Sequence, residues 1–277
     1  MTEAIFNKFT FNGKLYDTSQ FDSIYRSTSP SVYEVIRVMD GTPLFLEEHY
    51  KRLISSAASI GKNISFPIES LNENIQALCK ANTIKSNNVK LIINDFSSNP
   101  DGISYLFFIH SSYPTEEMYR NGVTTGLYSA VRENPNAKII NQSLRDGVNE
   151  YLKNNSLYEA LLVNKNDEVT EGSRSNIFFI KNGQAYTSPA EGVLLGVTRQ
   201  RIIRLCTENS IKVHEENIPV ASLNEFDAAF ISGTSPKVLP ISSIGDVMLS
   251  CSNNCLRKIM GLYDQEISNY LCLHKSN

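Results

Sequence analysis

The stretch at residues 138–179, KIINQSLRDGVNEYLKNNSLYEALLVNKNDEVTEGSRSNIFF, organises the interpretation of the whole chain. It opens with Lys138 among apolar neighbours and continues into a run that predicts a helix over residues 139–154. Two predicted strands joined by a polar turn follow, and the second ends at Glu171, directly before Gly172. A lysine in an apolar setting and a carboxylate at a strand end are both candidates for chemistry.

Each of these two residues also has a structural alternative. A desolvated lysine has a lowered pKa and can act as a nucleophile. The alternative for Lys138 is a lysine at a helix start whose ammonium group reaches water. Glu171 ends a predicted strand before a sharp turn at Gly172, and the serines that follow could offer hydroxyl or N–H groups to an anion. The alternative for Glu171 is an ordinary surface turn.

Three further segments could bind an anion. Arg52 lies on a predicted helix, and its guanidinium group suits two-point contact with phosphate, although a solvated position beside Lys51 is the alternative. Residues 196–199, GVTR, precede a helical run whose first N–H groups are unpaired and whose dipole is positive there. Residues 232–235, SGTS, follow an apolar strand and could form a second site of this kind.

Both halves of the chain combine hairpins, helices and strands. Asn-Gly and Asp-Gly pairs predict tight turns at residues 12–13, 40–41 and 182–183. Apolar residues three and four apart predict further helices at residues 47–60, 68–81, 198–209 and 252–270. We therefore expect an α+β protein with a small N-terminal domain at residues 1–115, a linker at 116–122 and a larger domain at 123–277.

The composition argues against several classes of function. The chain has 277 residues and a net charge of −3, without a long basic run, so neither nucleic acid nor an anionic membrane is an expected partner. No apolar run approaches the roughly 20 residues that span a bilayer, and no targeting segment is recognisable at the N-terminus, so we expect a cytoplasmic protein. The five scattered cysteines indicate free thiols. Zinc at Cys251 and Cys255 is an alternative that lacks a matching second pair.

The order of the motifs is more specific than any one of them. Along the chain they are Val32-Tyr33-Glu34, Glu48-His49-x-x-Arg52, Lys138-x-x-Asn141, Thr170-Glu171-Gly172-Ser173-x-Ser175, Gly196-Val197-Thr198 and Ser232-Gly233-Thr234-Ser235. Over nearly the whole chain this order resembles the class IV aminotransferases, the fold-type IV enzymes that use pyridoxal 5′-phosphate (PLP). That family includes branched-chain aminotransferases, D-amino acid aminotransferases and aminodeoxychorismate lyase. The resemblance implies a two-domain α+β enzyme.

The resemblance also implies a role for each matching residue. Lys138 would be the catalytic residue, forming the Schiff base with PLP and moving a proton, while Glu171 would keep the pyridine nitrogen protonated. The remaining expected cofactor ligands are Arg52, Val197, Thr198, Thr234 and Ser235, with Asn141 and Ser173 in support. A homodimer, with PLP between the two domains of each subunit, is implied as well.

The substrates implied by the family are an amino acid and a 2-oxo acid. D-amino acid aminotransferases carry an Arg-x-His carboxylate trap, but residues 94–101, NDFSSNPD, contain neither residue. We therefore expect Arg26 or Arg174 to bind the substrate carboxylate and Tyr33 to contact the substrate; a solvated loop position is the alternative for Arg26.

Two other functions stay open at this point. A lyase of the aminodeoxychorismate type would eliminate pyruvate with the same lysine. A non-catalytic PLP-binding or regulatory protein is the other alternative, and the presence of both Lys138 and Glu171 argues against it.

Overall fold

The computed structural model describes residues 3–97, 99, 101–131, 136–139 and 142–274. Contacts divide the chain into two compact units. Unit 1 comprises Met1–Ser112, Ala137–Ile140 and Ile267–Asn277, and unit 2 comprises Tyr113–Asn136 and Asn141–Glu266.

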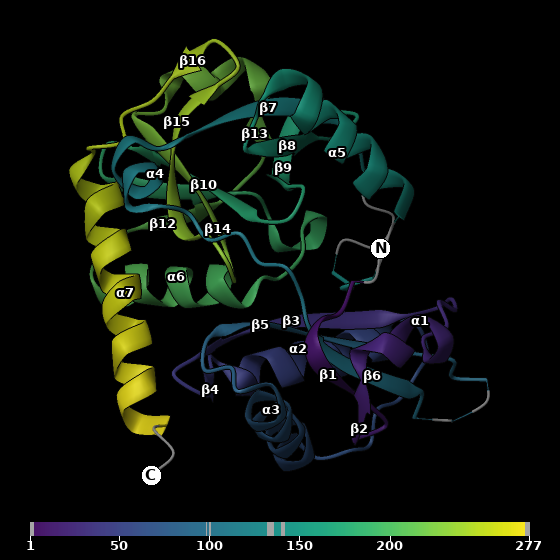
Figure 1. The fold of residues 1–277 in the computed structure, drawn as a ribbon. Coiled ribbons are helices and arrows are strands. Elements are labelled where there is room, and N and C mark those ends of the chain that lie inside the picture. Colours follow the sequence, from purple (N-terminus) through teal and green to yellow (C-terminus); the bar gives the residue numbers. More distant parts are fainter. Residues whose placement is uncertain (1–2, 98, 100, 132–135, 140–141, 275–277) are drawn as a thin grey trace. The chain divides into compact units, whose positions relative to one another are not determined.

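Unit 1 is a six-stranded antiparallel sheet with two long helices on one face (Figure 1). Its elements are β1 (Ile5–Phe11), β2 (Lys14–Asp17), η1 (Thr18–Gln20), α1 (Phe21–Ile24), β3 (Val32–Met39), β4 (Thr42–Pro43), α2 (Leu46–Ser59), α3 (Ile68–Asn82), β5 (Asn87–Asn94) and β6 (Ile103–Phe108). The strand order is β2-β1-β6-β5-β3-β4. Alternate residues of β3 are fully buried, which is the pattern of a strand that directs one side chain in two toward a core.

The two faces of this sheet have different covers. The apolar stripes of α2 and α3 pack on one face, and the predicted stripe of α3 is buried at Leu71, Ile75, Leu78 and Cys79. On the other face, rings from β1, α1 and β6 form a second cluster around Phe107.

The hairpin predictions are confirmed by the backbone. Asn12-Gly13, Asp40-Gly41 and Asn182-Gly183 each have positive φ at both residues, as the tight primed turn requires. The first joins β1 to β2 and the second joins β3 to β4.

Unit 2 is built on a larger mixed sheet. Its elements are α4 (Glu116–Asn121), β7 (Val123–Ser129), α5 (Gln142–Asn155), β8 (Glu159–Val163), β9 (Glu168–Gly172), β10 (Asn176–Lys181), β11 (Gln184–Thr187), η2 (Ala190–Gly192), α6 (Val197–Glu208), β12 (Val213–Glu215), β13 (Ile218–Pro219), η3 (Val220–Glu225), β14 (Ala228–Gly233), β15 (Lys237–Ile244) and β16 (Val247–Met248). The strand order is β12-β11-β10-β14-β15-β7-β8-β9-β13, with β16 beside β15. β7 pairs in parallel with both β8 and β15, and most other pairs are antiparallel.

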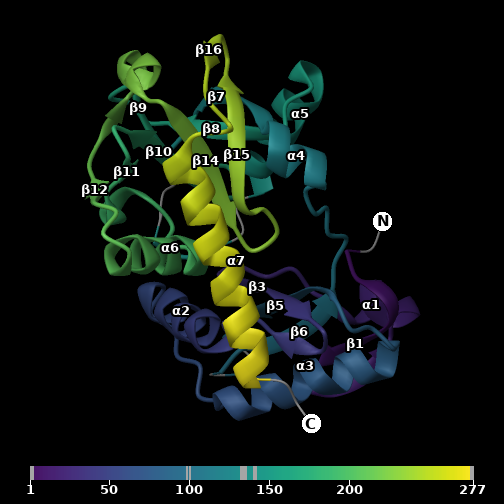
Figure 2. The same ribbon diagram turned by 90° about the vertical axis from the view of Figure 1, so that its left-hand side faces the viewer.

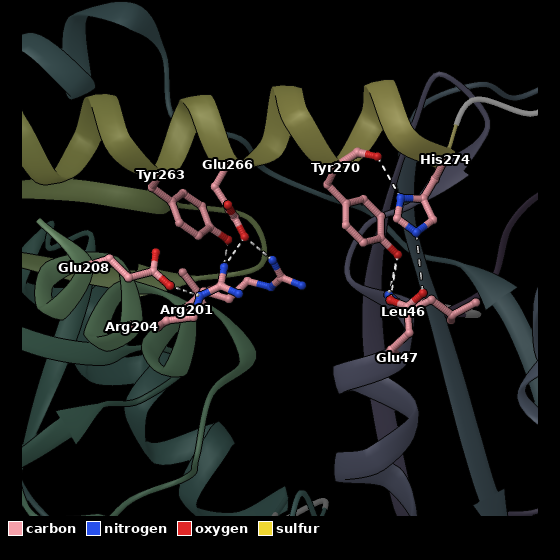
Figure 3. Close-up of polar contacts among 10 residues, drawn as sticks. Leu46, Glu47, Arg201, Arg204, Glu208, Tyr263, Glu266, Tyr270 and His274 are labelled. Atoms are coloured by element: carbon pink, nitrogen blue, oxygen red, sulfur yellow. Dashed lines mark hydrogen bonds and ion pairs between the residues drawn. The ribbon is translucent and has the colours of Figure 1, made fainter.

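The last helix, α7 (Asn254–His274), contributes residues to both units (Figure 2). In unit 2, Glu266 pairs with Arg201 and Arg204 of α6 (Figure 3). In unit 1, the hydroxyl of Tyr270 donates to Glu47 at 2.8 Å and accepts the N–H of Leu46 at 3.2 Å. Among the described residues no helix has the length and apolar character needed to cross a membrane.

The structure differs from the expected elements around Lys138 and around residue 116. The helix expected over residues 139–154 spans Gln142–Asn155 instead, and Ile139 forms an isolated bridge with Val32. Strand pairing therefore takes the residues beside Lys138 out of the helix. The expected linker at residues 116–122 largely coincides with α4, which the contacts place in unit 2, whereas Ala137–Ile140 falls in unit 1.

Candidate active site

The backbone of Lys138 is held on two sides within unit 1. Its carbonyl oxygen accepts the N–H of Tyr33 at 3.1 Å, and its own N–H donates to the hydroxyl of Ser56 at 3.2 Å. The ammonium nitrogen lies 4.8 Å from the centre of the Tyr33 ring, within range of a cation–π contact. A short segment bridged to β3, rather than a helix start, therefore positions this lysine.

A buried charge cluster lies on the opposite side of β3, because successive strand residues face opposite ways. Arg52 donates from Nε to one oxygen of Glu34 and from Nη2 to the other, both at 2.7 Å. The Nδ1 atom of His49 lies 2.8 Å from the second oxygen. His49, Arg52 and Ser56 are three and four residues apart on α2, so they share one face of that helix.

These contacts set the charges of the cluster. Burial by itself raises the pKa of Glu34, but the guanidinium of Arg52 and its hydrogen bonds outweigh it and hold that pKa well below its usual range. Burial lowers the pKa of His49, and the nearby Arg52 and Lys138 add to this effect, so the imidazole is neutral at pH 7. The structure thus gives Arg52 a carboxylate partner that the sequence analysis missed, although Glu34 stood in one of the quoted motifs.

In unit 2, Glu171 is the next-to-last residue of β9 and is buried, at 2% exposure. One oxygen accepts the N–H of Leu194 at 3.2 Å. A Cβ atom on Gly172 would clash with the hydroxyl of Ser175, so a larger residue there would require that buried side chain to move. The turn after Glu171 is therefore tightly packed and fixes where the carboxylate can lie.

A second buried carboxylate, Glu159, organises that turn. It accepts the hydroxyls of Ser173 at 2.6 Å and Ser175 at 2.9 Å, and the N–H of Arg174 at 3.4 Å. The sequence analysis missed Glu159 because it lies on β8, and only strand pairing brings it beside the turn. The hydroxyl of Ser173, expected to support the cofactor, is directed to this carboxylate, and the exposed Arg174 donates to Asn149.

The start of α6 has the properties of an anion site. Its N-cap residue is Gly196, and no side chain caps the first turn, so the first N–H groups have no acceptor within the helix. Thr198 is buried and its hydroxyl oxygen accepts the O–H of Tyr263 at 3.2 Å. A Cβ atom on Gly196 would lie 2.2 Å from the side-chain oxygen of Asn176, whose amide group donates to Leu194.

Neighbouring polar atoms fit a phosphorylated cofactor. Ser232 lies directly opposite Asn176 in the pairing of β10 with β14, so both side chains leave the same face of the sheet. Its buried hydroxyl has no hydrogen-bond partner among the described residues. Thr234 and Ser235 occupy the turn that follows β14. A buried unpaired hydroxyl beside an uncapped helix start is the donor set that a phosphate group requires.

The remaining predicted residues belong to unit 1 or lie outside the described residues. Arg26 is exposed, and its guanidinium donates to the carbonyl of Tyr25 at 3.0 Å. Asn141 lies outside the described residues. Lys138, Arg52 and Tyr33 belong to unit 1, whereas Glu171, Val197, Thr198, Thr234 and Ser235 belong to unit 2. The described residues include no cluster of three metal-ligating side chains, and all five cysteines are free.

The chain is similar to known proteins both in sequence and in fold. Residues 31–244 match the amino-transferase class IV family. The chain belongs to this family. It is 29% identical over 254 residues to a D-alanine aminotransferase of Bacillus licheniformis, covering 86% of this chain and 88% of the relative.

The fold of this class IV aminotransferase is shared with solved structures of low sequence identity. One is the T.th. branched-chain amino acid aminotransferase with pyridoxamine 5′-phosphate, at 22% identity and a TM-score of 0.83, with 96% of each chain covered. Another is a Legionella pneumophila protein described provisionally as a 4-amino-4-deoxychorismate lyase, at 19% identity and a TM-score of 0.76, covering 88% of this chain and 97% of that one. The chain is thus an α+β enzyme of fold type IV, in a family that depends on PLP.

Proposed function

We propose that this enzyme moves an amino group between an amino acid and a 2-oxo acid, with PLP attached to Lys138. The observation that carries the proposal is the double anchoring of the Lys138 backbone, which leaves its amine over the Tyr33 ring. When bound, PLP supplies an electron sink that stabilises negative charge at the substrate Cα atom.

The residues of the chain do the remaining work. The amine of Lys138 moves the proton at the substrate Cα atom, a task for which a positioned base is required. The buried carboxylate of Glu171 holds a proton on the pyridine nitrogen, and its bond to the N–H of Leu194 keeps it in place. Glu159 positions this carboxylate indirectly, by ordering the turn that follows it.

We assign the phosphate group to the start of α6. The N–H groups of Val197 and Thr198 and the hydroxyl of Thr198 are donors there, joined by Thr234 and Ser235. Arg52 would contribute through the N–H groups that its bond to Glu34 leaves over. Ser173 and Asn141 remain supporting residues of this proposal.

The family is the basis on which we propose the substrate and the assembly. The name of the relative from Bacillus licheniformis makes D-amino acids the first donors to test. A homodimer in the cytoplasm is the assembly and location that we propose.

Borohydride reduction of the purified enzyme, followed by peptide mapping, tests the proposal. We expect a stable label on Lys138, absent from Lys138→Ala and retained in Lys153→Ala, which changes an exposed lysine. A label at another lysine, or none, would contradict the central assignment and, in the second case, favour a non-catalytic homologue.

A lyase activity is the second candidate, and the likeness to the Legionella pneumophila protein favours testing it. Repeated turnover that forms pyruvate without a 2-oxo acid acceptor indicates elimination. Turnover that requires the acceptor indicates amino transfer.

A further inference from the structure

A second lysine lies beside the same aromatic ring as Lys138. Lys90 is directly opposite Val35 in the pairing of β5 with β3, and Tyr33 is two residues before Val35, so Lys90 and Tyr33 leave the same face of the sheet. The ammonium nitrogen of Lys90 lies 5.4 Å from the centre of the Tyr33 ring. The amines of Lys90 and Lys138 thus both lie close to the Tyr33 ring.

This lysine is buried and depends on a replaceable counter-ion. Its side chain is 3% exposed, and its ammonium group pairs with the carboxylate of Glu3. Glu3 is 46% exposed and belongs to the short segment before β1. Among the described residues no other carboxylate pairs with Lys90, and a buried ammonium group without an anion is strongly unfavourable. Any anion that displaces Glu3 can therefore pair with the buried ammonium group of Lys90.

Three arginine side chains are less suitable than Lys90 for binding the substrate carboxylate. Residues 94–101 contain no arginine or histidine, and Arg26 is exposed. Arg174 donates to Asn149. Arg37 shares the face of Tyr33 but lies four residues further along β3, about 13 Å away.

We propose that Lys90 is a binding site for a carboxylate of the substrate, and that Glu3 fills it as an internal stand-in when no substrate is present. The proposal rests on the proposed function for the position of the substrate near Lys138. It adds a recognition residue and an internal competitor to that function. The carboxylate that binds is either the α-carboxylate or the side-chain carboxylate of a dicarboxylic amino acid, since both offer the same chemistry.

Two variants test the proposal because they shift ligand binding in opposite directions. The probe is succinate, an unreactive dicarboxylate, titrated into the purified holoenzyme by calorimetry. Lys90→Met should raise the Kd of succinate at least about tenfold, and Lys90→Arg should stay close to the wild type because it keeps the charge. Glu3→Gln should lower the Kd of succinate about two- to tenfold, because no carboxylate at position 3 then competes with the ligand for Lys90.

The controls separate a recognition role from a structural one. Lys8→Met, which breaks the exposed pair with Asp17, should leave succinate binding unchanged. If the Lys90–Glu3 pair were only structural, Glu3→Gln would not tighten binding, and that outcome overturns the proposal even if Lys90→Met folds poorly. An unchanged Kd in a folded Lys90→Met protein overturns it as well.

Turnover distinguishes the two sources of the carboxylate. In Lys90→Met, a raised KM for every amino donor assigns the α-carboxylate, and a raised KM only for aspartate and glutamate assigns the side-chain carboxylate. Borohydride labelling of Lys138 in the same variant is independent of this result. Labelling without any change in succinate binding therefore refutes the Lys90 site and leaves the proposed function intact.

Discussion

Arg52 and Glu34 form a two-point ion pair, in which Nε and Nη2 of Arg52 each lie 2.7 Å from a different carboxylate oxygen of Glu34. Both side chains are almost fully buried, Glu34 on β3 and Arg52 on α2. Because the guanidinium group is planar, two parallel bonds fix its orientation as well as its position. The pair therefore joins the strand that carries Tyr33 to the helix that carries Ser56, the two residues that hold the Lys138 backbone.

Removing one member of this pair should destabilise the protein. Glu34→Gln leaves the guanidinium of Arg52 buried without its counter-ion, so we expect a loss of about 3–5 kcal/mol in the free energy of unfolding at pH 7. Urea denaturation measures this loss. Asp17→Asn, which breaks the exposed pair with Lys8, is the matched control and should cost less than about 1 kcal/mol. Equal losses in the two variants would refute the assigned importance of the buried pair.

The same pair predicts how stability responds to acid. The pKa of Glu34 is lowered in the folded protein, so its contribution is complete above the unfolded value near 4.5 and is lost as the pH falls through the folded pKa. Wild-type stability should therefore fall on acidification below about pH 4.5. In Glu34→Gln this component should be missing, which denaturation curves collected at successive pH values will detect as a shallower decline.

His49 predicts a separate change at higher pH. Burial keeps its folded pKa below the ordinary value of 6.5, so below that pH the unfolded chain binds a proton that the folded chain does not. Stability should consequently decrease as the pH falls from 7 to 5. His49→Gln should flatten the decrease in that interval; a slope identical to the wild type would show that folding does not shift the pKa of His49.

Replacement of the Glu171 carboxylate should separate cofactor binding from catalysis. Glu171→Gln keeps an acceptor for the N–H of Leu194 but loses the negative charge. We expect kcat to fall about 10²- to 10³-fold, the usual cost of removing one electrostatic contact to the reacting system. PLP affinity, measured by titration of the apoprotein, should change much less. Glu168→Gln on the same strand is the control, and an equal loss of kcat there would contradict the role of Glu171.

Gly196 offers a steric test of the phosphate site. In Gly196→Ala the new Cβ atom meets Asn176, which must release the carbonyl of Leu194 and disturb the segment that holds Glu171. We expect PLP affinity to fall about tenfold or more, equivalent to about 1.4 kcal/mol. Gly192→Ala is the nearby control, since no atom lies within 4 Å of its added Cβ. Unchanged affinity in Gly196→Ala would place the phosphate elsewhere.

Much of the fold was predictable because its signals are local. The hairpin turns at residues 12–13, 40–41 and 182–183 need positive φ, and the Asn-Gly and Asp-Gly pairs that satisfy it are visible in the sequence. The buried stripe of α3 follows in the same way from residues three and four apart. The start of α5 was missed, because Ile139 forms a bridge with Val32, a residue more than 100 positions earlier in the chain.

The candidate site also contains residues that the sequence indicated and residues that only the structure revealed. The identity and order of Lys138, Glu171 and Thr198 were readable, and they indicated the family before any contact was known. Glu159 was not readable as a functional residue, because its partners are 14 to 16 positions away and meet it only through strand pairing. Tyr33 and Glu34 face opposite sides of β3, as strand geometry predicts. Only the structure shows that Lys138 lies beside Tyr33 on one side and Arg52 beside Glu34 on the other.

The sequence by itself determined most of the helices and strands, the hairpin turns and the order of the motifs that indicate the family. Helices, strands and turns depend on neighbours within a few positions, and the motifs are visible as residue order. Only the tertiary structure decided the partners: a carboxylate for Arg52, an aromatic ring for Lys138 and the carboxylate of Glu3 for Lys90. The physical reason is that charge and burial act through space, so the environment of an ionisable group depends on residues that are distant along the chain.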